Sequence, residues 1–176
     1  MDDSTSETLD RVKVVFLAER LRYETIRLRD LRFDKARSIV TIPTCRQIHN
    51  GPVRAVRRGI LSRTSEQDWI ASLLTIRFVQ TCEIQNIDER GVYGYSIWDY
   101  DSGTLRARFG KRATLQMEVD YFKYDFMDIG VCGKVFTRRF PLGFHLLWAE
   151  ATFPDLAGCT RSKTLFYRMY AEKEDE

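Results

Sequence analysis

The sequence predicts an α+β fold: a single domain in which a helical pair in the first half packs on a mostly antiparallel β-sheet. Three observations favour this fold. Residues 50–78 carry apolar side chains at helical spacing, whereas apolar and polar residues alternate from about residue 79 onward. The chain has 176 residues, 44% of them hydrophobic, and no linker-like segment divides it, so one shared core is expected.

The expected domain boundaries follow from composition. Residues 1–8 are polar and acidic and predict a disordered tail, and residues 172–176 predict an acidic C-terminal tail. Residues 9–171 between them are expected to form one globular α+β domain. The sequence shows neither a signal peptide nor an apolar run of the roughly 18 residues that a membrane span needs, so a reducing, cytosolic-type compartment is expected.

The first elements are a helical or extended segment over residues 9–33 and a short strand. Val12, Leu17 and Leu21 fit a helical period only loosely. Ser38–Pro43 is rich in β-branched residues and ends at a proline, which is typical of a strand.

A helix is predicted for residues 50–61, followed almost directly by a second helix over residues 65–78. Asn50 is a candidate N-cap of the first, and Pro52 falls in its first turn, where a missing N–H costs little. Ser65 and Asp68 have a spacing like that of a capping box at the start of the second. The apolar faces are Val53, Val56 and Ile60 in the first helix and Trp69, Ile70, Leu73 and Leu74 in the second.

The second half predicts strands. Residues 92–98 form one, residues 99–103 have the composition of a turn, and residues 114–122 alternate most clearly. Further strands are expected at residues 129–136 and 163–170, with a short helix or buried turn at 143–151. In the 114–122 strand the residues predicted to share the buried face are Leu115, Met117, Val119 and Tyr121.

The sequence carries no catalytic signature, so we expect a protein that is not an enzyme. It lacks a nucleophile elbow, a P-loop, a dinucleotide-binding glycine motif and a zinc-protease motif, and it has only two histidines. No cofactor and no metal are expected either, because none of the four cysteines forms a closely spaced ligand pair. A small enzyme with an unrecognised site is a remaining alternative, which predicts a deep polar pocket.

One segment of the chain is strongly basic, although the net charge is only +3. No Asp or Glu occurs from Lys35 to Ser65. Arginine dominates this window, and its planar fork suits phosphate better than mere solubility requires. The window therefore predicts contact with an anionic surface, against the alternative of an ordinary solvated helix face. The residues predicted to make this contact are Lys35, Arg37, Arg46, Arg54, Arg57, Arg58 and Arg63.

The same window holds no aromatic residue between Lys35 and Ser65. Proteins that read RNA usually add aromatic side chains for stacking on bases. Phosphate contact without base reading, on lipid headgroups or on a nucleoprotein, is therefore favoured. Residues 124–130 and 138–148 are richer in large apolar residues than connecting loops need. Most of these residues are expected in the core, and the part that is exposed predicts a self-association surface. Its candidate residues are Phe140, Leu142, Phe144 and Trp148.

The order of these elements resembles that of the rhabdovirus matrix proteins, in the short form of the plant-infecting, cytorhabdovirus-like members. The resemblance is carried by Arg37–Phe78, where a strand ending at a proline precedes a predicted basic amphipathic helix and a second predicted helix with Trp69 and a long aliphatic face. The antiparallel sheet with aromatic strands that is predicted to follow gives further support over Gly94–Phe122. The N-terminus departs from the pattern of the animal members: it is acidic rather than lysine-rich, and the proline-rich budding motif is absent.

The resemblance implies a viral structural protein that bridges the nucleocapsid and the membrane. Its expected partners are an anionic membrane surface, the viral nucleoprotein and further copies of itself, and its expected location is the virion, the host cytoplasm and, peripherally, host membranes. The alternative is an RNA-binding protein or silencing suppressor that places the same arginines on a phosphate backbone.

Overall fold

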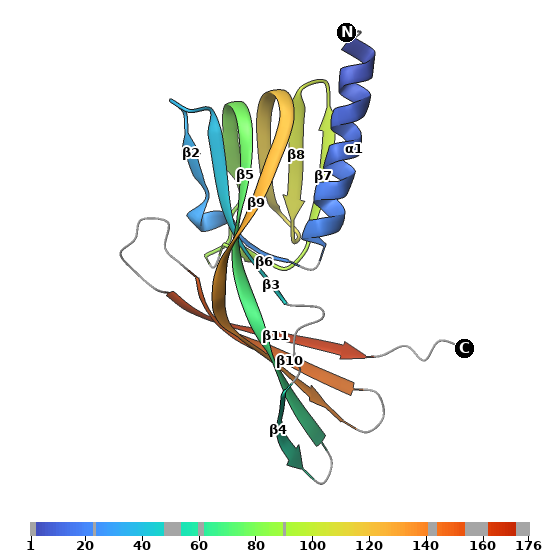
Figure 1. The fold of residues 1–176 in the computed structure, drawn as a ribbon, viewed down its shortest axis with the longest axis vertical. Coiled ribbons are helices and arrows are strands. Elements are labelled where there is room, and N and C mark those ends of the chain that lie inside the picture. Colours follow the sequence, from blue (N-terminus) through green and yellow to red (C-terminus); the bar gives the residue numbers. More distant parts are fainter. Residues whose placement is uncertain are drawn as a thin grey trace, which may run out of the picture. The chain divides into compact units, whose positions relative to one another are not determined.

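The computed structural model describes residues 3–22, 24–47, 54–59, 62–89, 91–140, 144–153 and 162–171 (Figure 1). These ranges contain one α-helix, α1, and a short 3-10 helix, η1; almost everything else is strand. The helices are α1 (Asp3–Leu21) and η1 (Leu28–Asp30). The strands are β1 (Thr25–Arg27), β2 (Arg32–Asp34), β3 (Ile39–Gln47), β4 (Arg54–Gly59), β5 (Ser62–Gln85), β6 (Val92–Tyr93), β7 (Ser96–Asp101), β8 (Thr104–Phe109), β9 (Ala113–Arg139), β10 (Phe144–Phe153) and β11 (Ser162–Ala171).

The strands follow the order β11-β10-β9-β5-β3-β1-β6, with β7 and β8 joined to β9, β2 to β3, and β4 to β5. Every strand pair whose register is described is antiparallel. The chain divides into two compact units. Unit 1 comprises residues 1–44 and 72–128, and unit 2 comprises residues 45–71 and 129–176. The long strands β5 and β9 contribute residues to both. The single domain expected for residues 9–171 stays a prediction.

The helical pair predicted for residues 50–61 and 65–78 is not formed, so this part of the predicted fold is wrong. The described residues of the first segment form β4, and the second lies within β5. In β5, Ser72, Leu74 and Ile76 are almost fully buried at every second position. The spacing of apolar residues here fits a helix and a strand equally well, and the choice is made by β3 and β9, which pair with β5 on either side. Non-local pairing of this kind is not visible in a local period.

Of four further expected helices, strands and tails, the structure confirms one and corrects three. Residues 144–151, expected in a short helix or buried turn, belong to strand β10, so that prediction is wrong. The strand at 163–170 is confirmed by β11. Strand β3 continues through Pro43 instead of ending there. Helix α1 begins at Asp3, inside the segment 1–8 for which the sequence predicts a tail.

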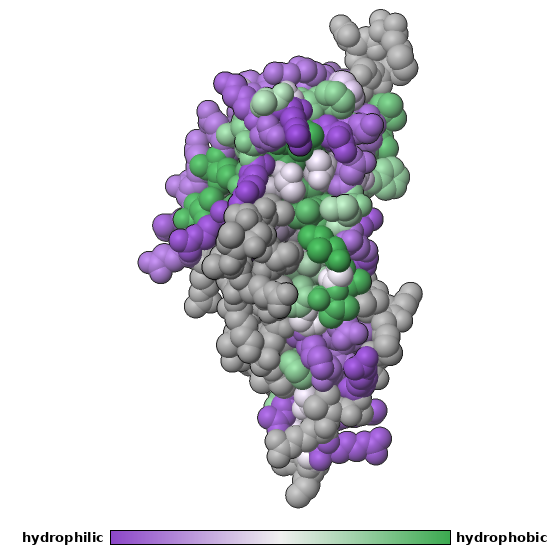
Figure 2. Space-filling view, turned by 60° about the vertical axis from the view of Figure 1, so that its left-hand side comes forward, coloured by the Kyte–Doolittle hydropathy of each residue, from purple (hydrophilic) through white to green (hydrophobic). Residues whose placement is uncertain are grey.

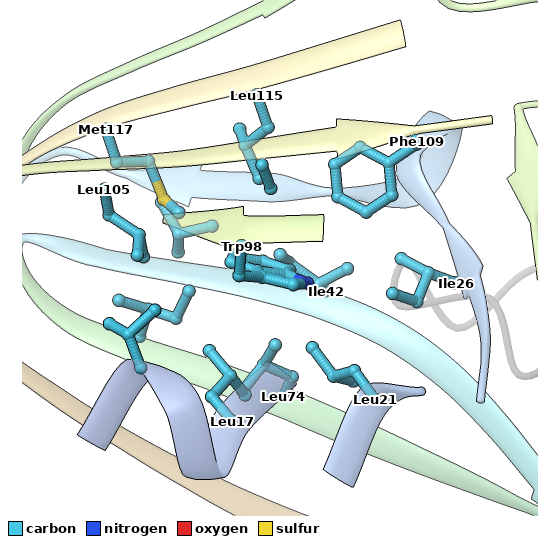
Figure 3. Close-up of a cluster of buried hydrophobic side chains, with 14 of the residues drawn as sticks. Leu17, Leu21, Ile26, Ile42, Leu74, Trp98, Leu105, Phe109, Leu115 and Met117 are labelled. Carbon is cyan, nitrogen blue, oxygen red and sulfur yellow. The ribbon is translucent and has the colours of Figure 1, made fainter. Parts of the chain in front are cut away.

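Unit 1 has one hydrophobic core between α1 and the sheet, and α1 packs beside β7 (Figures 1 and 3). Leu17 and Leu21 of α1 are completely buried. They face a cluster that includes Trp98 and Phe109, whose rings meet edge to face with centroids 5.7 Å apart. Burial of these apolar side chains is the main stabilising contribution to unit 1.

The strand predicted at residues 114–122 is confirmed as part of β9, with one exception on its buried face. Leu115, Met117 and Val119 are buried as predicted, but Tyr121 is 43% exposed. Phe122 is fully buried in its place, so the alternation shifts by one residue between positions 119 and 122. The ring of Tyr121 instead contacts Phe78 on β5, with centroids 3.9 Å apart.

The β7–β8 hairpin turns later than the sequence predicts. Asp99 and Asp101 belong to β7, and the turn is made by Ser102 and Gly103, which have φ angles of 47° and 79°. Two consecutive residues with positive φ give a turn whose twist matches that of the flanking strands. The glycine therefore fixes the end of this hairpin.

Candidate anionic-surface site

The basic segment forms a two-stranded hairpin in unit 2, made by β4 and the start of β5. The two strands are antiparallel, and a shift of register between Ala55 and Arg57 leaves Val56 as an extra residue on β4. Arg54 and Arg58 on β4 are exposed, as is Arg63 on β5. An extended hairpin presents these guanidinium groups on a thin element that is open to a partner.

Arg58 and Arg63 lie directly opposite each other across the hairpin. Directly opposed residues of antiparallel strands project to the same face, with Cβ atoms about 5 Å apart. Two positive charges at this spacing repel each other, so the pair destabilises the hairpin in isolation. An anion that binds both guanidinium groups removes the repulsion and gains two charge-assisted contacts.

The remaining arginines of the hairpin have different neighbours. Arg54 lies opposite Glu66, an arrangement of opposite charges, and Arg57 lies opposite Thr64. Glu66 is only 12% exposed and pairs with Lys134 of β9. The charges of β4 are therefore only partly compensated within the hairpin.

Positive charge is concentrated in unit 2. Its described residues include ten lysines and arginines but only three acids, whereas those of unit 1 hold fifteen and sixteen. Hydrophilic side chains gather at the end of unit 2 that holds the hairpin (Figure 2). The ten basic residues are Arg46, Arg54, Arg57, Arg58, Arg63, Lys134, Arg138, Arg139, Lys163 and Arg168; the three acids are Glu66, Asp68 and Glu150.

The sequence prediction missed half of these basic residues, because they lie on β9 and β11 and not in the basic window. Arg138 donates a hydrogen bond from Nε to Ser62 Oγ at 3.0 Å, and Ser65 Oγ donates to the backbone oxygen of Thr137 at 3.4 Å. These contacts join the end of β9 to the hairpin. Their only sequence signal is the doublet Arg138–Arg139 directly after an apolar run, and its proximity to residue 62 depends on strand pairing over more than 70 positions.

Three of the predicted contact residues do not belong to the hairpin. Lys35 and Arg37 lie in unit 1, in the turn between β2 and β3. Arg37 is tied to Asp34, with its backbone N donating to Oδ1 at 3.1 Å and its Nε 3.7 Å from Oδ2. Arg46 is on β3 in unit 2 and is half-buried.

The predicted self-association residues that the structure describes lie on β10 or directly after β9. Phe140 follows β9 and is 37% exposed, with the guanidinium carbon of Arg138 5.5 Å from its ring centroid. Phe144 and Trp148 lie on β10, opposite Ala171 and Tyr167 of β11. Leu142 lies outside the described residues.

Unit 1 carries a separate groove of about 350 Å³ on the outer face of β5, β7, β8 and β9. Its charged lining is mixed, with Glu83 and Asp99 beside Arg106 and Arg108. Asp99 lies directly opposite Arg106, an arrangement that favours a compensated polar surface. The groove suits a small polar ligand carrying both signs of charge better than a polyanion.

Within the described part of the chain, no three or more histidine, cysteine, aspartate or glutamate side chains gather closely enough to hold a metal ion. No helix in the same ranges is both long and apolar enough to cross a membrane. No protein-family model, no curated protein and no solved structure matches this chain.

Proposed function

We propose that this protein is a structural protein of the viral matrix type, which docks on an anionic membrane surface through the arginines of unit 2 and assembles there by self-association. The observation that carries the proposal is the excess of basic residues in unit 2, with Arg58 and Arg63 opposed on an exposed hairpin. The helical pair on which the resemblance to matrix proteins depended is not formed, so the proposal rests on charge and exposure.

Exposed apolar residues in the same unit favour a membrane over other anionic surfaces. Ile129 and Val131 of β9 are 46% and 65% exposed, and Phe140 is 37% exposed. Proteins that bind at the membrane interface combine apolar contact with electrostatic attraction to anionic lipids. Unit 2 offers both.

The expected binding is reversible. Each lysine or arginine near an anionic leaflet contributes on the order of 1 kcal/mol, and this attraction is screened as salt rises. A few exposed arginines therefore give weak attachment for one copy. Stable recruitment requires several linked copies, because multivalency raises the overall affinity without new contacts. In this account self-association and membrane docking act together, and the nucleocapsid is the second partner that the assembled layer holds.

A second candidate function is binding to the phosphate backbone of nucleic acid. The shape of the site favours it, because a two-stranded ribbon with arginines is also an element that nucleic-acid-binding proteins use. Such binding would fall steeply with salt and would not depend on lipid composition.

The test is co-flotation of the full chain with vesicles of neutral phosphatidylcholine and with vesicles containing phosphatidylserine, at about 50 mM and about 300 mM salt. Duplex RNA is added to a parallel set as a competitor. We expect flotation with the phosphatidylserine vesicles alone, weaker at high salt and little affected by RNA at equal charge. Equal flotation with both vesicle types, or none, contradicts the proposal. RNA binding that abolishes flotation favours the second candidate.

A further inference from the structure

Two cysteine thiols of unit 2 lie in contact although they are far apart in the sequence. Cys45 is on β3 and Cys132 is on β9, and their Sγ atoms are 3.3 Å apart. Strand order places β5 between these two strands, and Cys132 Sγ also lies 3.4 Å from the backbone oxygen of Trp69 on β5. The distance between the two sulfur atoms exceeds the length of a disulfide bond, about 2.0 Å, by roughly 1.3 Å.

The two thiols differ in access. Cys45 is fully buried, whereas Cys132 is partly exposed. An incoming reagent therefore reaches Cys132 first. Cys45 is placed behind it as the group that can respond, which is the arrangement of an attacking and a resolving thiol.

The environment of Cys132 favours its thiolate form. A hydrogen bond from the Cys45 thiol lowers the pKa of Cys132, although burial acts in the opposite direction. Cys82 in unit 1 provides a contrast, because burial raises its pKa to about 11. The thiolate is the reactive species in thiol–disulfide exchange, so Cys132 is expected to react well before Cys82.

We propose that Cys45 and Cys132 form a reversible redox modification site, which a small disulfide such as oxidised glutathione converts to an intramolecular disulfide. In the first step the Cys132 thiolate attacks one sulfur of the small disulfide, whose S–S bond breaks and releases one thiolate. In the second step the deprotonated Cys45 attacks the Cys132 sulfur and releases the second thiolate. Two protein thiols are oxidised and one small disulfide is reduced to two thiols, so atoms and electrons balance.

The bond would tie β3 to β9 within the basic unit. It closes a loop between positions 45 and 132, and cross-links over long loops restrict the unfolded chain most strongly. Cys45 directly precedes Arg46, so the oxidised form also fixes the strand that carries this basic residue. Oxidation is therefore expected to stabilise unit 2.

The test treats the full chain with oxidised glutathione near pH 8, then blocks free thiols and maps the cysteines by mass spectrometry without reduction. A Cys82→Ser/Cys159→Ser variant keeps only the two cysteines of the proposed pair. Cys159 lies outside the described ranges. We expect this variant to form the Cys45–Cys132 disulfide and to show a higher Tm that reducing agent reverses. Cys132 should react about tenfold or more faster than Cys82 in the wild-type chain.

Single variants separate the two steps. Cys45→Ala should stop at a stable glutathione adduct on Cys132, and Cys132→Ser should leave Cys45 unmodified. The inference is overturned if the two-cysteine variant keeps both thiols free under these conditions while circular dichroism shows it folded. It is equally overturned if the wild-type disulfide joins a different pair. Neither result bears on membrane docking, which is measured under reducing conditions.

Discussion

Asp10 on α1 is a buried carboxylate that holds the helix to the sheet of unit 1. It accepts hydrogen bonds from the backbone N of Phe122 at 2.9 Å and from the Tyr100 hydroxyl at 3.4 Å, and Lys13 Nζ is 2.6 Å from Oδ1. Burial, followed by the charge of Asp10, raises the pKa of Tyr100. One side chain thus satisfies donors from the helix and from two strands.

Replacement of this carboxylate should destabilise unit 1. Asp10→Ala leaves the buried Phe122 N–H without its acceptor, and we expect the free energy of unfolding to fall by about 2–4 kcal/mol. The matched control is Glu7→Ala, which removes an exposed carboxylate paired with Arg11 and should cost less than about 1 kcal/mol. Urea unfolding measures both variants. Equal effects of the two would show that Asp10 does not anchor the helix.

Cys82 predicts a specific alkaline effect on stability. Burial disfavours the thiolate and raises its folded pKa to about 11, above the ordinary value of 9.0. A raised folded pKa gives stability that is fully present below about pH 9 and is lost as the pH rises through about 11. Cys82→Ala should therefore show a smaller fall in unfolding free energy between about pH 8 and about pH 10.5 than the wild type. An identical fall in urea unfolding would contradict the assigned burial effect.

At the scale of the element, the β4–β5 hairpin carries a charge arrangement that favours binding over stability. Arg58 faces Arg63, whereas Arg54 faces Glu66. A site that keeps a locally unfavourable pair is where a functional demand is expected to outweigh stability. The two positions on β4 give a matched comparison, because the same substitution has opposite consequences at each.

The substitution Arg58→Glu should stabilise the hairpin, because it replaces a like-charge pair by an opposite-charge pair. Cross-strand pairs of this kind contribute about 0.2–1 kcal/mol. Arg54→Glu should destabilise by a similar amount, since it places two carboxylates opposite each other. Thermal unfolding at low salt measures the difference, and both variants carry the same net charge. A loss of stability in Arg58→Glu would refute the opposition of Arg58 and Arg63.

The elements also show what a local pattern can and cannot predict. The alternation of Leu115, Met117 and Val119 gave the correct strand, because only a period of two explains it. Helix α1 gave no clear signal, since apolar residues occur both on its buried face, as at Leu17, and on its outer face, as at Phe16, which is 65% exposed. The segment 65–78 was misassigned because its neighbours β3 and β9 are distant in sequence and determine its state.

The sequence predicted only part of the candidate site, because a local pattern does not indicate pairing between distant strands. Arg54, Arg58 and Arg63 lie close in sequence, and the structure brings them together on one hairpin, although as strands and not as a helix. Lys134 and Arg138 join the same unit through the pairing of β9, which no local pattern indicates.

At the scale of the whole molecule, charge is divided between the two units. The acid-free window of the sequence contributes to both units, but the excess of positive charge belongs to unit 2. In the described part of unit 1 the numbers of basic and acidic residues are nearly equal. The central claim is therefore that the exposed arginines of the unit 2 hairpin, and not positive charge in general, carry the contact with an anionic membrane.

The most direct measurement of this claim is the affinity for phosphatidylserine vesicles of Arg58→Glu/Arg63→Glu compared with Lys111→Glu/Arg112→Glu. The second pair is exposed in the β8–β9 turn of unit 1 and removes the same charge. The first variant keeps a like-charge pair across the hairpin, so the strand pairing should be equally stable. We predict a loss of affinity of about tenfold or more in the first variant, from about 1 kcal/mol per charge, and less than about threefold in the second. Equal losses, with both variants folded, would contradict the claim.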